Sequence, residues 1–105
     1  MHRLLISSVL LFSAAAFGET WNGTLMDVMC EGKDATSHTR QCAIACAKSG
    51  YGIVLADGKF LKFNDQGNAK TLAALKSTKK DKDLKTKVTG KLESGVIAVD
   101  SLDIL

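Results

Sequence analysis

Residues 53–76, IVLADGKFLKFNDQGNAKTLAALK, decide the fold that the sequence predicts, because they join a hairpin to a helix. The hairpin comes first, as two short apolar runs at residues 53–55 and 60–63 separated by a turn-prone gap. Asp57-Gly58 in that gap is a strong signal for a two-residue turn, in which both positions take positive φ. We therefore expect two antiparallel strands joined by a tight turn.

The helix of this segment follows a second turn at residues 64–67, NDQG. Asn68 can cap a helix over residues 69–76 by accepting a backbone N–H bond. Leu72 and Leu75 then lie on one apolar face of that helix. The pattern predicts a short helix packed against the hairpin.

Strands are also predicted at both ends of the chain. Residues 20–29, TWNGTLMDVM, contain β-branched and aromatic side chains, and Gly23 among them indicates a bend or a close backbone approach. Residues 84–92 alternate in polarity, and Gly90 among them can form a bulge. Residues 96–105 are expected to close the chain as a last strand.

Another helix is predicted before the hairpin. Residues 40–48, RQCAIACAK, are rich in alanine, and Gly50 can end the helix. Without this helix, the predicted order is that of the OB-fold, a five-stranded Greek-key barrel with a helix between strands three and four. We therefore predict a mainly β protein with two short helices, an OB-like five-stranded barrel with a helical insert between strands 1 and 2.

The first stretch of the chain has the pattern of a secretory signal peptide. After a short positive start, residues 4–12 form an apolar run, and small residues lead to a cleavage site after Gly18, with Ala16 as the second choice. The run is shorter than the roughly 20 residues that span a bilayer. We expect a signal peptide at residues 1–18 and a single OB-like domain at residues 19–105, secreted or periplasmic.

Charge and composition exclude several classes of function. The formal net charge of +3 is too weak to favour nucleic acid or an anionic membrane surface. No second long apolar run follows the leader, so no membrane contact is expected after cleavage. The chain has no Ser-His-Asp pattern, paired catalytic carboxylates or glycine-rich phosphate loop, so we do not expect an enzyme. We also expect a monomer.

All three cysteines, Cys30, Cys42 and Cys46, fall in one segment together with His38. Thiolates and imidazole bind zinc and copper, so these four residues are predicted to form a Cys3His metal site, although their spacing matches no standard zinc pattern. In an oxidising compartment, two cysteines within reach form a disulfide instead. A disulfide staple, with a third buried cysteine and a solvent-facing histidine, is therefore the alternative, and no cofactor is certain.

Spacing limits how these residues can cooperate. On a helix, Cys42 and Cys46 share a face with β-carbons about 5–6 Å apart, which suits two metal ligands better than a mutual disulfide. Cys30, at the end of the first strand, is the natural disulfide partner of either one. His38 can join the site only if the helix begins after it, and Thr39 as N-cap would allow that.

Asp27 lies three residues before Cys30 in a strand that is otherwise mostly apolar or small. Its carboxylate can support His38 through a hydrogen bond. Aspartates in such positions more commonly accept backbone N–H bonds from the adjacent loop, and we expect that here. Tyr51 is expected to pack near the insert.

Several motifs occur together in this chain, and they cover most of residues 19–105: Trp21-x-Gly23-x-Leu25-x-Asp27-x-x-Cys30, His38, Cys42-x-x-x-Cys46, Ser49-Gly50-Tyr51-Gly52 and Val88-Thr89-Gly90-Lys91-Leu92. With these motifs the chain resembles small exported bacterial proteins of uncharacterised function. The resemblance implies a secreted OB-like barrel with a Cys/His-bearing insert, and it implies no particular activity.

The sequence therefore predicts an exported small binding or structural module of the cell envelope, which binds zinc or copper through Cys30, His38, Cys42 and Cys46. The alternative is a disulfide-stapled interaction domain without metal. Its partner would be an envelope protein, a glycan or a small ligand bound through the barrel face.

Overall fold

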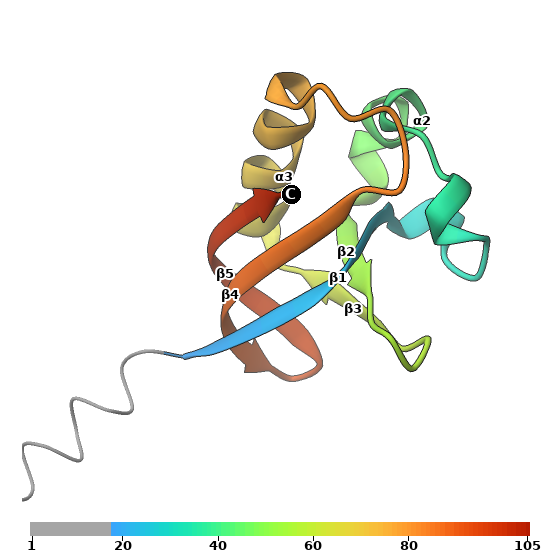
Figure 1. Cartoon of the computed structure of the whole chain (residues 1–105). Helices are drawn as coiled ribbons and strands as arrows, with labels where there is room; N and C mark the ends of the chain where they lie inside the picture. Colours follow the sequence, from blue (N-terminus) through green and yellow to red (C-terminus); the bar gives the residue numbers. More distant parts are fainter. Residues whose placement is uncertain (1–17) are drawn as a thin grey trace, which may run out of the picture.

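The computed structural model describes residues 18–105, which form a five-stranded mixed sheet with two α-helices (Figure 1). The prediction of a mainly β protein with two helices is confirmed. The elements in chain order are β1 (Glu19–Asp27), α2 (Arg40–Ala45), β2 (Tyr51–Val54), β3 (Phe60–Phe63), α3 (Asp65–Ser77), β4 (Lys85–Glu93) and β5 (Val96–Ile104).

The predicted signal peptide, residues 1–18, lies outside the described residues except for Gly18. Within residues 18–105, no helix is both long enough and apolar enough to cross a membrane.

The strand pairing closes on itself. The hydrogen-bonded order is β1-β2-β3-β5-β4, and β4 pairs again with β1. Every pairing is antiparallel except that of β3 with β5, which is parallel. Each strand therefore has two neighbours, which leaves no long free edge to attract another chain.

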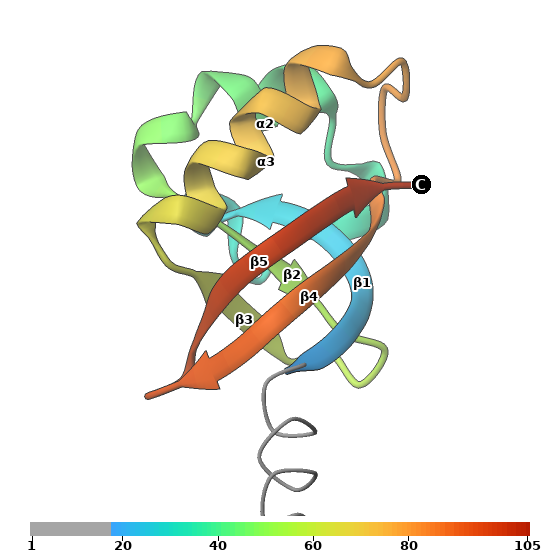
Figure 2. The ribbon, with the colours of Figure 1, turned by 90° about the vertical axis from the view of Figure 1, so that its left-hand side faces the viewer.

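β1 closes the sheet because it changes partner along its length. Its first part, up to Thr24, pairs with β4, and its second part, from Thr24 to Asp27, pairs with β2. A β-carbon on Gly23 would lie 2.6 Å from the carbonyl oxygen of Val54. The close backbone approach predicted at this glycine is therefore confirmed, and β1 curves strongly where it crosses the sheet (Figure 2).

The core lies inside the closed sheet and under α3. The alternation predicted along residues 84–92 places Leu84, Thr86 and Val88 inside, and the intervening lysines outside. The bulge predicted at Gly90 is confirmed by a register shift between Thr89 and Gly90. The large apolar side chains of the core are Leu25, Tyr51, Ile53, Leu61, Phe63, Leu75, Leu84, Val88, Ile97 and Val99.

The helix α3 begins one turn earlier than predicted. Asn64, not Asn68, is its N-cap, and the Asn64 side chain accepts a 2.9 Å hydrogen bond from Gly67 N–H. Gly67 allows this start because it is buried against Phe63 and Val99, where a β-carbon would clash. Asn68 instead accepts a 2.9 Å bond from Tyr51 N–H, so it ties the helix to β2.

The predicted two-residue turn at Asp57-Gly58 is wrong. Gly58 has positive φ, but Asp57 does not, and the connection runs over residues 55–59. Asp57 acts through its side chain, which accepts a bond from Lys59 N–H at 2.9 Å. The turn in which two consecutive residues have positive φ is the one between β4 and β5, at Ser94 and Gly95.

The segment between β1 and β2 holds α2 and three short 3-10 turns, Val28–Cys30, Ala35–Ser37 and Ala47–Ser49. The helix predicted over residues 40–48 is therefore broken at Cys46, and the strand predicted to reach residue 29 ends at Asp27. Gly50, with φ of 87°, ends the last turn and leads into β2. Figure 2 shows α2 beside α3 at one end of the sheet.

Candidate metal centre

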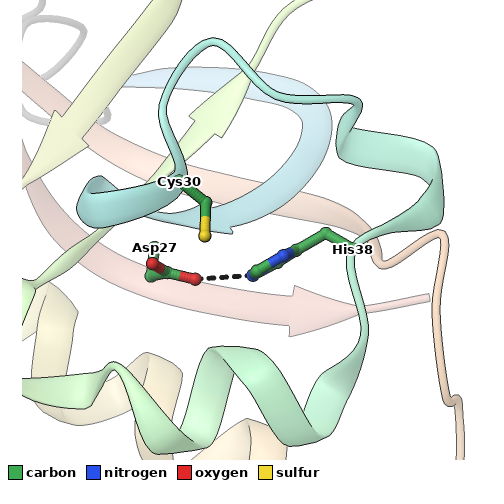
Figure 3. A group of neighbouring side chains, drawn as sticks. All are labelled: Asp27, Cys30 and His38. Atoms are coloured by element: carbon green, nitrogen blue, oxygen red, sulfur yellow. Dashed lines mark ion pairs between the residues drawn. The ribbon is translucent and has the colours of Figure 1, made fainter.

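The path from β1 to α2 brings three side chains of different chemistry to one point. Asp27, Cys30 and His38 each offer one ligand atom, and these atoms all lie within 4.8 Å of one another. Asp27 and His38 face each other, and the Cys30 sulfur points into the space beside them (Figure 3). A carboxylate, a thiol and an imidazole therefore share one small volume.

Asp27 ends β1, where it pairs with Tyr51 of β2, and its side chain is fully buried. One carboxylate oxygen lies 2.5 Å from Nε2 of His38. Apart from this contact, neither carboxylate oxygen has a hydrogen-bond partner within residues 18–105. The expected role for Asp27, acceptance of backbone N–H bonds, is wrong. The contact with His38, which the sequence made the less favoured interpretation, is the one that forms.

His38 lies in extended backbone between the turn Ala35–Ser37 and α2. The helix begins after it, at Arg40, with Thr39 as N-cap accepting a 3.1 Å bond from Cys42 N–H. The condition that the sequence set for His38 to join a site is thus met. Its side chain is 7% exposed, so the solvent-facing histidine of the alternative prediction is wrong.

Cys30 is held by a 3-10 turn rather than by the strand itself. Val28 N–H donates to Gly50 C=O at 2.9 Å, which anchors the start of this turn to the junction before β2. The thiol is half-buried. Burial raises its pKa, and the negative charge of Asp27 raises it further.

Cys42 lies on α2 and Cys46 is the C-cap of that helix, and both thiols lie outside the group of three ligand atoms. Cys46 is half-buried, and its pKa is raised by burial, by the charge of Asp27 and by Cys42. Cys42 is exposed. All three cysteines are free, so the described residues contain no disulfide staple.

Tyr51 packs against the insert, as expected. The phenol is buried, and its hydroxyl donates a 2.7 Å hydrogen bond to Ala43 C=O of α2. Burial raises the pKa of Tyr51 to about 12, and the charge of Asp27 contributes. The hydroxyl thus stays protonated and fixes α2 over the end of β1.

Comparison with known protein families, curated proteins and solved structures finds no match for this chain. What the site can do follows from its own chemistry.

The site concentrates electron-pair donors around a buried negative charge. Burial raises the pKa of Cys30, Cys46 and Tyr51, and the charge of Asp27 raises each of them further. Burying a carboxylate is costly unless a partner compensates its charge, and here the His38 imidazole is the side chain that faces it. A cation at this point would offset that cost and would also favour the thiolate forms of the cysteines.

The three ligand atoms fit a zinc-sized ion. Zinc binds thiolate sulfur at about 2.3 Å and imidazole nitrogen or carboxylate oxygen at about 2.0–2.2 Å, which places neighbouring ligand atoms of a tetrahedral site about 3.5 Å apart. The three ligand atoms lie within 4.8 Å of one another, and the Asp27 oxygen and His38 Nε2, which are 2.5 Å apart, would have to separate by about 1 Å for both to bind one zinc ion. Asp27 is the donor that the sequence did not place in the metal set; its position three residues before Cys30 was the available signal.

Proposed function

We propose that this protein is a small exported metal-binding module of the cell envelope, which holds zinc or copper at Asp27, Cys30 and His38. The observation that carries the proposal is the fully buried Asp27 carboxylate, which has no hydrogen-bond partner within the described residues apart from its contact with His38 and lies against an imidazole and a thiol. An OB-like barrel is part of the proposal, and the closed order β1-β2-β3-β5-β4 with α3 between β3 and β4 supports it.

The mixed donor set favours zinc over copper(I). Copper(I) prefers sulfur ligands, whereas zinc accepts sulfur, nitrogen and oxygen together. A structural zinc site has four ligands. We assign the fourth position to Cys46, a half-buried thiol at the end of α2 whose pKa is raised by burial and by the charge of Asp27.

The test is zinc affinity, measured on the purified protein under a reducing phosphine by competition with a chromophoric chelator. The wild-type chain should bind one zinc ion. Cys30→Ser and His38→Ala should each weaken binding by at least about 10-fold, equivalent to about 1.4 kcal/mol. Asp100→Asn, which removes an exposed carboxylate of β5, is the matched control and should bind as the wild type does. If the wild type binds no zinc, or if both site variants bind as tightly as it does, the proposal is wrong.

A further inference from the structure

The solvent exposure of the candidate donor residues falls from Cys42 to Asp27. Cys42 is exposed, Cys46 and Cys30 are half-buried, and Asp27 is fully buried. His38, the other buried donor, is 7% exposed. Of these donors, Cys42 is therefore the one that an ion bound to another molecule can meet at the surface.

The spacing of the two helical cysteines places such a donor within reach. Cys46 N–H donates a 3.1 Å bond to Cys42 C=O, so the two residues are one helical turn apart and share a face. Their β-carbons are then about 5–6 Å apart, close enough for both sulfurs to bind one ion.

We propose that Cys42 is the entry thiol of the site, which takes zinc from a thiol-bearing carrier and passes it to Cys46 without remaining a ligand. This inference rests on the proposed function, since it presumes a metal site at Asp27, Cys30 and His38. It gives the site a partner of defined chemistry: a zinc–thiolate complex.

The transfer is an exchange of ligands with no change in oxidation state. The Cys42 thiol loses its proton to water and its sulfur bonds to the carried zinc, while one carrier thiolate leaves and takes up a proton. Cys46 then bonds to the same ion in the same way and a second carrier thiolate leaves. The ion would then bind Cys30, His38 and Asp27: the Cys30 thiol gives up its proton as its Zn–S bond forms, and Cys42 takes up a proton as its own Zn–S bond breaks.

The experiment measures, by stopped flow, the rate at which zinc transfers from its glutathione complex to the metal-free protein. The rate for Cys42→Ser is compared with the rate for the wild type. We expect the transfer rate to fall by at least about 10-fold, while the zinc affinity at equilibrium stays within about 2-fold of the wild-type value. Return of zinc from the protein to glutathione should slow by the same factor, because an unchanged equilibrium requires that the forward and reverse rates of this transfer change together. Gln41→Ser, the exposed neighbour on α2, is the matched control and should transfer at the wild-type rate.

The outcomes separate the two proposals. A wild-type protein that takes up no zinc overturns the proposed function, and the inference with it. Zinc uptake at equal rates in wild type and Cys42→Ser overturns the inference alone. A loss of equilibrium affinity in Cys42→Ser makes Cys42 a permanent ligand, which also overturns it. A thermal melt of each metal-free variant shows that the exposed substitution leaves the fold intact.

Discussion

At position 51, one hydroxyl group connects the insert to the sheet. The Tyr51 ring belongs to the core, and its O–H donates to Ala43 C=O at 2.7 Å across the boundary between β2 and α2. A buried hydroxyl and a buried carbonyl satisfy each other through this hydrogen bond, so removal of the hydroxyl leaves the carbonyl without its partner.

Tyr51→Phe should therefore lower the free energy of unfolding of the metal-free protein by about 1 kcal/mol. The ring stays in place, so the zinc affinity should change by less than about 2-fold. Urea unfolding with an unchanged m-value measures the first quantity. Equal stability of the two proteins would show that the bond to Ala43 contributes nothing.

Single residues also show how much of the candidate site can be predicted from the sequence. The cluster of Cys30 with His38 could be predicted, because rare ligand types in one short segment stand out. The contact of Asp27 with His38 could not, because it depends on the path of the chain through two 3-10 turns that leave no periodic pattern. The position of Cys42 depends on where α2 begins, and the N-cap Thr39 decides that start.

Among the elements, α2 has the most influence on the site. It is only six residues long, too short to be stable alone, so its N-cap and its contacts determine whether it forms. Thr39 caps it through the bond from Cys42 N–H, and the same residue fixes the extended backbone that aims His38 inward.

Thr39→Ala should lower the free energy of unfolding by about 1 kcal/mol, the usual effect of losing an N-cap side chain. It should also weaken zinc binding, because the His38 imidazole is then held less firmly before the ion arrives. Thr39→Ser keeps the capping oxygen and should restore both properties. If serine and alanine behave alike, the side-chain cap is not what positions His38.

The elements also show why some boundaries could be predicted and others not. Alternation gave the buried face of β4 correctly, since it needs only the period of a strand. The local sequence does not decide whether Asn64 or Asn68 is the N-cap of α3, since either can cap a helix. Asn64 is used because its side chain also lies 3.3 Å from Val99 N–H of β5, a tertiary contact that no local pattern records.

For the whole molecule, the weak point is the attachment of the insert. The sheet closes on itself and is filled by one core, whereas the segment from Val28 to Ser49 contributes one fully buried side chain, Ala43. A disulfide would have fixed this segment, but all three cysteines are free. In a domain of this size, where the core alone gives marginal stability, a bound ion can supply that link.

Zinc should therefore raise the melting temperature of the protein. Binding to the folded state alone adds about 2.7 kcal/mol at a free zinc concentration 100 times the dissociation constant. For a domain of this size that corresponds to a shift of roughly 10–20 °C. His38→Ala should lose most of the shift and Asp100→Asn should keep it, because only the first removes a donor that bridges the insert to the end of β1. Calorimetric scans with and without zinc measure the shift. An equal shift in His38→Ala would mean that zinc binds elsewhere on the chain and does not hold the insert to the sheet.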